Sequence, residues 1–241
     1  MAPAPKYSVD EQEELILNAA ANCIAETSVL DFTMSSVSKA AGLSMGSIYK
    51  HVQCKEDIIF ALASRVFKHH CNLFKQVFEL PLTTPEKIIA LTLFDPDKIQ
   101  VYPFDKDLED FAANEVVISR ASSKWTERMI NAHEMCESVF NKVMHQAAYN
   151  GELKLNGNTE QMIEEINLGC WALIVGHEYV ERVIQTRHIS EGTDTLREAV
   201  KTDALIVRSL ARLLSSYEWQ TPLTTEDIEK TSQILIENGL R

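Results

Sequence analysis

Between Thr33 and Lys55 the chain has side chains that could bind phosphate and read bases, and it has no acidic residue there. The 23 residues include three lysines, several hydroxyl groups, a tyrosine and a histidine. Lysine binds phosphate oxygens as a point charge, and hydroxyl groups donate to phosphates and base edges. DNA carries about one negative charge per 1.7 Å of duplex axis, so an acidic protein would contact it through such a segment. On charge alone, an ordinary solvated surface is the simpler interpretation of this segment. Whether it binds DNA depends on the helices that position these side chains.

The rest of the chain is acidic and poor in turn-forming residues. The net charge is −12, and residues 76–241 alone contribute −11. The 241 residues contain only eight glycines and seven prolines. A sandwich or barrel needs frequent turns, so this composition favours an all-α protein of one or two domains with a sizeable core.

The five cysteines are widely spaced and include no Cys-x-x-Cys pair, so we expect neither a disulfide framework nor a zinc ribbon. The first residues lack the basic-then-apolar order of a signal peptide. The longest uncharged apolar stretch, residues 168–176, is much shorter than the roughly 20 residues that cross a bilayer. We therefore expect a soluble, cytoplasmic protein without a membrane segment or cofactor.

Two short helices are predicted within the acid-free segment. Thr33 can cap a helix over 34–41 that Gly42 ends, and Ser44 can cap a second helix over 45–52. Two short helices joined by a glycine-containing turn are typical of a helix-turn-helix. The second helix would enter a major groove about 12 Å wide while the first crosses the backbone. Gly46, near the start of the second helix, would let its backbone approach DNA closely.

Helices are expected along the whole chain. A Ser8-x-x-Glu11 capping box opens a helix over 9–26, and an apolar stripe indicates a long helix over 56–78. Further helices are expected at residues 85–95, 106–120, 124–149, 159–187, 195–217 and 225–238. We place a DNA-binding domain at residues 1–55 and a larger helical domain at residues 56–241.

The segment from Thr33 to Asp57 resembles the helix-turn-helix of the tetracycline-repressor (TetR) family. The matching positions are Thr33, Ala41, Gly42, Ser44, Gly46, Tyr49, His51, Lys55 and Glu56, with Leu43 and Ile48 as apolar equivalents. The resemblance covers roughly residues 12–62, and beyond it only the helical pattern agrees. It implies an N-terminal three-helix DNA-binding domain joined to a helical bundle that dimerises and binds a ligand.

By this resemblance, two sets of residues would contact double-stranded DNA. Phosphates would be bound by Thr33, Tyr49, His51 and Lys55, and bases would be approached by Ser44, Met45, Ser47 and Lys50, with Gly46 between them. Three residues depart from the family pattern. Met45 stands where lysine is common, Val52 replaces phenylalanine, and Cys54 replaces a hydroxyl or amide cap. Whether the Cys54 thiol has a redox role is left open.

A homodimer is implied by the same resemblance and is compatible with two later helices. Residues 168–175 are apolar around nearly the whole helix, and the next helix has one apolar side formed by Ala199, Ile206, Leu210, Leu213 and Leu214. Pairing these helices with their symmetry mates would place two recognition helices about 34 to 36 Å apart on a palindromic operator. Burial within a single protomer is the alternative, which periodicity cannot exclude.

Trp125, His133 and Trp171 are candidate effector-pocket residues, because they lie on helices that line the pocket in the family. Ordinary core packing is the alternative role for each of them. The effector itself cannot be identified from the sequence.

The expected function is a transcriptional regulator, a repressor that a small-molecule effector releases from DNA, and not an enzyme. One alternative is a DNA-bound scaffold that recruits a protein. Another is a helical metalloprotein, suggested by His-Glu-x-x-Glu at residues 133–137 and again at residues 177–181. Known bundle and protease sites use Glu-x-x-His or His-Glu-x-x-His instead, so we expect no metal site.

Overall fold

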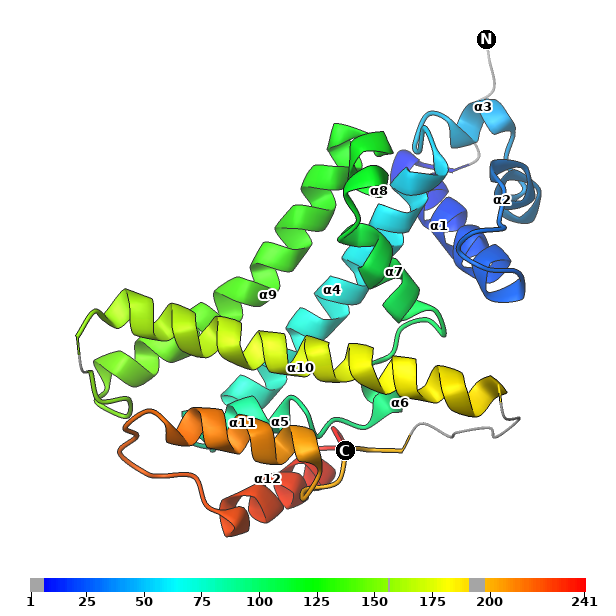
Figure 1. Ribbon diagram of the computed structural model, residues 1–241. Coiled ribbons are helices and arrows are strands. Elements are labelled where there is room, and N and C mark those ends of the chain that lie inside the picture. The colour runs from blue at the N-terminus through cyan, green and yellow to red at the C-terminus, as the bar shows by residue number, and fades with distance from the viewer. Residues whose placement is uncertain (1–6, 156, 191–197) are drawn as a thin grey trace. The chain divides into compact units, whose positions relative to one another are not determined.

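The computed structural model describes residues 7–155, 157–190 and 198–241, and this part of the chain is helical (Figure 1). Its β structure is limited to one isolated antiparallel bridge between Leu153 and Trp219. The expected all-α class is confirmed. No helix in the described ranges has both the length and the apolar content that a membrane span requires.

The chain divides into two compact units. Unit 1 comprises residues 1–70 and 100–136, and unit 2 comprises residues 71–99 and 137–241. Unit 1 contains α1 (Val9–Glu26), α2 (Met34–Ala41), α3 (Met45–Ile48), the first part of α4 (Lys55–Glu79), α7 (Asp105–Ala112), α8 (Glu115–Arg120) and the first half of α9 (Ser123–Tyr149). Unit 2 contains the remainders of α4 and α9 together with α5 (Thr84–Ala90), α6 (Pro96–Ile99), α10 (Thr159–Ser190), α11 (Leu205–Ser215) and α12 (Thr225–Glu237).

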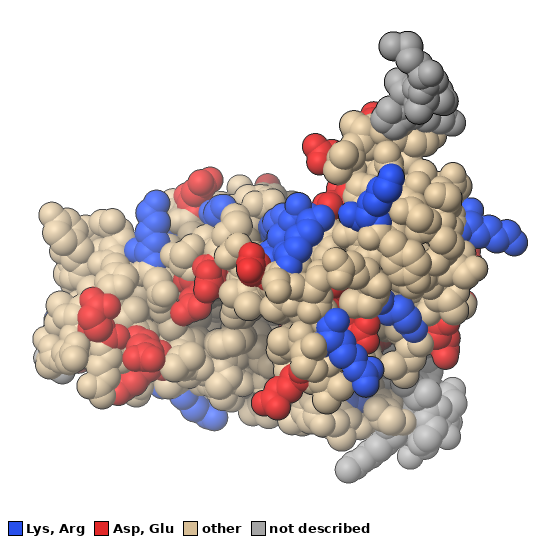
Figure 2. Space-filling model, turned by 90° about the horizontal axis from the view of Figure 1, so that it is seen from above, with Lys and Arg blue, Asp and Glu red and all other residues tan. Residues whose placement is uncertain are grey.

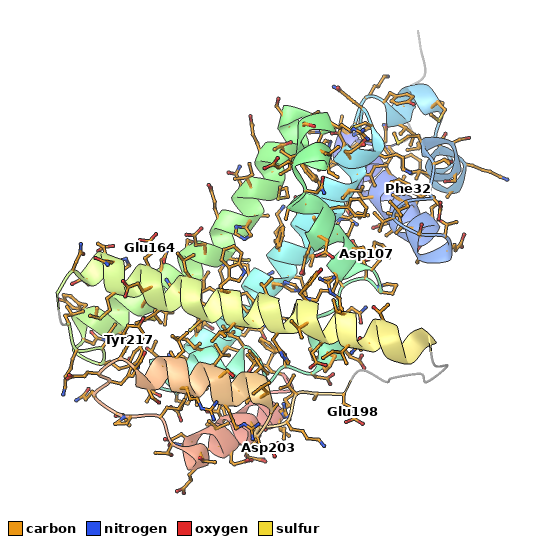
Figure 3. All side chains as sticks on the ribbon, viewed as in Figure 1. Phe32, Asp107, Glu164, Glu198, Asp203 and Tyr217 are labelled. Atoms are coloured by element: carbon orange, nitrogen blue, oxygen red, sulfur yellow. The ribbon has the colours of Figure 1, made fainter. Side chains whose placement is uncertain are left out.

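Each unit has its own hydrophobic core. In unit 1, Phe32 lies in the interior (Figure 3) and packs with buried residues such as Ile48 and Phe60. In unit 2, Ile89, Leu210 and other apolar side chains from α5, α9, α10, α11 and α12 form the second core. Burial on this scale is the main source of stability for helices of these lengths.

Local capping explains where the first helices begin and end. Ser8 and Glu11 form the expected capping box of α1, and Thr33 caps α2 through the backbone N–H of Ser36. Gly42 ends α2 with φ of 64°, in the left-handed region that favours glycine. These boundaries were predictable because each depends only on neighbouring residues.

Four predicted boundaries differ from the structure. The helix expected over 106–120 is two helices, because Asn114 caps a new one by accepting from the N–H groups of Val116 and Val117. The helix expected up to residue 95 ends at Ala90. The helix over 45–52 is α-helical only to Ile48 and continues as turns. The helix expected from Thr195 begins at Leu205, although Thr195 itself lies outside the described residues.

Both α4 and α9 run from one unit into the other along the chain. The contacts therefore divide these two helices internally, after His70 and after Cys136. The functional boundary at residue 55, with a DNA-binding domain at 1–55 and a helical domain at 56–241, stays a prediction.

Candidate nucleic-acid interface

Helix α3, the predicted recognition helix, is short and is built from local hydrogen bonds. The Ser44 hydroxyl caps it by accepting from the N–H of Ser47, with an oxygen–nitrogen distance of 3.1 Å. The hydroxyl groups of Ser44 and Ser47 also lie 3.0 Å apart, within hydrogen-bond distance. Ile48 is fully buried and anchors the helix to the core of unit 1. One anchored face leaves the opposite side of the helix for a ligand.

Most of the predicted DNA-contacting residues are accessible. Thr33, Ser44, Gly46, Tyr49 and Lys50 are exposed, and Met45 and Ser47 are half-buried. Tyr49 is 50% exposed although it is a large ring, which is unusual for an aromatic residue next to a core. Exposed hydroxyl, ammonium and phenol groups on and around one helix N-terminus suit contacts to phosphates and base edges.

His51 differs from the other predicted contacts because it is buried. Its carbonyl oxygen accepts a hydrogen bond from the indole N–H of Trp125, at 3.0 Å. Burial is the largest cause that lowers the pKa of His51; the Glu13 carboxylate opposes this, and the charges of Lys124 and Lys50 reinforce it. A neutral, buried imidazole is poorly suited to act as a phosphate-binding cation.

The lowered pKa of His51 predicts a pH dependence of stability. The unfolded chain binds a proton at His51 near pH 6.5, whereas the folded chain binds it only at lower pH. Between those values the unfolded state holds more protons, so the free energy of unfolding falls as pH drops below about 6.5. We expect His51→Gln to reduce this fall, measured by urea unfolding at pH 7.5 and at pH 5.5. An unchanged pH dependence in the variant would contradict the assignment to His51.

Lys55, the first residue of α4, is held by the protein itself. Its ammonium group donates to the carbonyl oxygen of Leu30 at 2.8 Å and lies 4.5 Å from the centre of the Phe32 ring. The side chain thus closes the loop between α1 and α2. A Lys55→Ala variant would change this loop as well as any phosphate contact, so it is a poor test of DNA binding.

Two of the three residues that depart from the family pattern, Val52 and Cys54, pack within unit 1. Val52 is fully buried in the core of unit 1. The Cys54 thiol accepts a hydrogen bond from the backbone N–H of Asp57, as a weak helix cap, and donates to the carbonyl of Arg120 at 3.5 Å. Burial is the main cause that raises the pKa of Cys54 to about 11. A thiol that stays protonated at neutral pH is a weak nucleophile, which disfavours a redox role.

Asp57 is a structural residue that the sequence interpretation did not single out. Its carboxylate is fully buried and accepts from the backbone N–H groups of Gln53 and Ser122, each at 2.7 Å. It therefore joins the start of α4 to the residue before α9. The only sequence signal was an acid at the third position of a helix, which also fits a simple cap.

The three candidate effector residues lie in different surroundings. Trp125 and His133 belong to α9 in unit 1, and Trp171 belongs to α10 in unit 2. Trp125 is 2% exposed and uses its N–H within the protein, while the His133 ring packs edge-on against Phe67 with centroids 5.4 Å apart. Trp171 is about half exposed. Their assignment to an effector pocket stays a prediction.

Charges on the surface are mixed. Figure 2 shows a face on which Lys and Arg side chains are interspersed with Asp and Glu, with wide uncharged areas between them. Within the described ranges, no group of three or more His, Cys, Asp or Glu side chains is arranged to hold a metal ion.

One face of α10 is apolar and exposed. We call Leu168, Trp171, Val175, Tyr179 and Val183 the α10 stripe; they recur every three or four residues and are each 45 to 59% exposed. The opposite face of the same helix, with Ile163, Ile166 and Cys170, is buried in the core of unit 2. Exposed apolar residues in a continuous stripe mark an interaction surface more often than isolated ones do.

The apolar side of α11 lies inside the protomer, whereas the sequence interpretation considered it as part of a dimer interface. Ile206, Leu210 and Leu214 are buried within the protomer, at 4% exposure or less. Ala199 lies before the helix begins. The alternative of burial in a single protomer therefore holds for these residues, and of the described parts of α10 and α11 it is α10 that presents a continuous exposed apolar stripe.

The geometry of α1 to α3 is that of a helix-turn-helix, the motif of many DNA-binding proteins, joined to a further helical unit. Residues 16–62 match the family model described as bacterial regulatory proteins, tetR family. The resemblance seen in the sequence is confirmed over these residues.

Relatives by sequence include uncharacterized HTH-type transcriptional regulators of Mycobacterium tuberculosis and Mycobacterium bovis. They are 29% identical over 94 residues, which is 39% of this chain and 48% of the relative. The chain thus spans about half the length of these relatives.

Solved structures share the fold along most of the chain. A TetR-family transcriptional regulator from Cytophaga hutchinsonii aligns with a TM-score of 0.61 at 14% identity, over 90% of this chain and all of that chain. AmtR of Mycobacterium smegmatis aligns with a TM-score of 0.53 at 15% identity, over 100% and 98%. A SmeT–triclosan complex aligns with a TM-score of 0.51 at 14% identity, over 88% and 94%. At these identities the likeness establishes the fold.

Proposed function

We propose that this protein is a homodimeric transcriptional repressor that binds a palindromic operator and is released by a small-molecule effector. The observation that carries the proposal is the tetR-type recognition helix, whose surroundings expose Ser44, Tyr49 and Lys50 around a side-chain-free Gly46. Its site of action would be the cytoplasm, where chromosomal DNA is accessible.

The α10 stripe supports the homodimer. A twofold pairing places the same surface on both partners, so a stripe of apolar residues is self-complementary without any further partner. The two copies of unit 1 would then present two recognition helices to half-sites about 34 to 36 Å apart.

The effector part of the proposal rests on the shared helical fold, which in SmeT is found in complex with triclosan. An effector releases DNA only if it binds the released conformation more tightly than the DNA-bound one. His133, half-buried against Phe67 on α9, is our candidate for a residue that such a ligand would contact, with Trp125 and Trp171 as further candidates.

Selection from random duplex DNA tests the proposal. The wild-type protein should enrich a twofold-symmetric sequence, and the logarithm of its affinity should fall linearly with the logarithm of the salt concentration. Lys50→Ala should change the preferred bases rather than abolish binding. Failure to enrich any duplex, with no salt-sensitive binding, would overturn the proposed function.

Gly46→Ala distinguishes an effect on DNA binding from an effect on folding stability. A Cβ at Gly46 would meet only the Ser44 hydroxyl, at 3.9 Å, so the protein itself has room for alanine. Alanine is also the better helix former by roughly 0.5 to 1 kcal/mol. We therefore expect unfolding by urea to show equal or greater stability, while operator affinity falls about tenfold because the extra methyl holds the backbone away from phosphate. Unchanged operator affinity would mean that α3 does not approach the DNA backbone at this residue.

A further inference from the structure

The turn that follows the recognition helix is held by the start of α9. The indole N–H of Trp125 donates to the carbonyl of His51, and the N–H of Ser122 donates to the buried carboxylate of Asp57. These two contacts bracket the residues between α3 and the first turn of α4. They join positions that are 74 and 65 residues apart in the sequence.

Two cationic side chains also pack over the Trp125 ring and hold it in place. The ammonium of Lys124 and the guanidinium of Arg128 lie over the ring, at 4.7 and 4.6 Å from its centre. Both cations also pair with Glu13 of α1, at 3.3 and 2.7 Å. Burial opposes ionisation of the Glu13 carboxyl, but its bonds and charges with Arg128 and Lys124 outweigh this and lower its pKa. Trp125 therefore stands where α1, α9 and the end of α3 meet.

The end of α3 is anchored by the buried side chains of Ile48 and Val52, but the His51 carbonyl needs a partner from outside the helix. The helix has only four α-helical residues, and the turn after it is held by backbone bonds from the N–H of Lys50 to Ser47 and from the N–H groups of His51 and Val52 to Ile48. Carbonyl groups at a helix end need partners outside the helix. For His51, Trp125 supplies that partner in a buried setting, where an unmade hydrogen bond is costly.

From these contacts we propose that Trp125 is a positioning residue for the recognition helix, and that α9 acts on DNA binding through it. The inference rests on the proposed function. Because α9 is one continuous helix from Ser123 to Tyr149, a displacement along it reaches the His51 carbonyl directly. Trp125 would set how well α3 fits its operator, without itself touching DNA.

Trp125→Phe tests the proposal, with Trp219→Phe as a matched control. Trp219 is likewise buried, and its indole N–H donates to the carbonyl of Leu214 at 2.8 Å, but it lies in unit 2. We expect Trp125→Phe to weaken binding to the selected operator about fivefold, with unchanged binding to a random duplex at the same salt. Trp219→Phe should leave both affinities unchanged. Hydrogen exchange of the amides in residues 47–55 should be faster only in Trp125→Phe.

Wild-type operator affinity in Trp125→Phe would overturn the inference, as would an equal loss in Trp219→Phe. A second measurement does not require replacing Trp125. In the wild-type protein, the NMR signal of the Trp125 indole N–H should shift on adding operator but not on adding random duplex. An identical signal in the free, operator-bound and random-duplex states would also overturn it. Failure of the proposed function is distinguishable, because the wild-type protein would then select no operator.

Discussion

Replacing Asp57 with alanine is expected to lower the free energy of unfolding by about 3 to 5 kcal/mol. The carboxylate is fully buried and is the acceptor for two backbone N–H groups, those of Gln53 and Ser122. Removing it leaves both part-buried N–H donors without their partner, and each such loss costs about 1 to 3 kcal/mol. The effect is large because one side chain connects two distant segments of unit 1.

Asp227→Ala is the matched control for Asp57→Ala. Asp227 occupies the same third position of its helix, α12, and its carboxylate accepts from the backbone N–H and hydroxyl of Thr224. These contacts are exposed, so we expect a cost of about 1 kcal/mol or less. Urea unfolding of both variants measures the difference. Similar small losses in both would show that Asp57 is an ordinary cap rather than a connection between segments.

Asp57→Asn refines the same prediction. The amide has one acceptor oxygen and two donors, so it can satisfy only one of the two N–H groups while placing an NH₂ against the other. We therefore expect a loss close to that of alanine despite the nearly identical shape. Full stability in Asp57→Asn would mean that only one of the two hydrogen bonds contributes.

Local features of the chain could be predicted from the sequence because local physics decides them. The bounds of α1 and α2 follow from the capping box at Ser8 and Glu11, the Thr33 cap and the left-handed Gly42. Each signal depends on residues no more than four positions apart. The same holds for the recognition helix, whose start depends on the Ser44 hydroxyl.

Contacts between distant segments could not be predicted in this way. Nothing in the residues around Trp125 indicates that its N–H meets the carbonyl of His51, because a backbone carbonyl has no side-chain signature. The resemblance implied phosphate contacts for His51 and Lys55, whereas the structure buries His51 and places the Lys55 ammonium against Leu30 and Phe32. Periodicity identifies the apolar face of a helix but not the element that covers it.

The two long C-terminal helices illustrate the same limit. Residues 168–175 of α10 are apolar around the helix, and Ile206, Leu210 and Leu214 of α11 form an apolar side. Both patterns were compatible with a dimer interface or with a protomer core. The structure assigns the α11 residues to the core of unit 2 and leaves one face of α10 exposed. Only the three-dimensional arrangement distinguishes a protomer core from an exposed face that could form a dimer interface.

Val175→Glu should convert the proposed dimer to monomers and weaken operator binding by at least about 100-fold. Val175 is the central member of the α10 stripe and is half exposed. In a twofold interface the new carboxylate occurs on both partners, so two like charges are buried together at a cost of several kcal/mol. A monomer reads only one half-site, and the gain from linking two half-sites is lost. Sedimentation and operator titration measure the two effects.

Two features make this prediction specific to the interface. The face of α10 that packs in the protomer, with Ile163, Ile166 and Cys170, is opposite the stripe, so the variant should keep the wild-type helix content. Val116→Glu on α8 introduces the same charge at another exposed valine and should leave a dimer with unchanged affinity. Because dimerisation follows mass action, a higher protein concentration should restore operator binding to Val175→Glu. If that variant stays dimeric at low concentration, the α10 stripe is not the dimer interface.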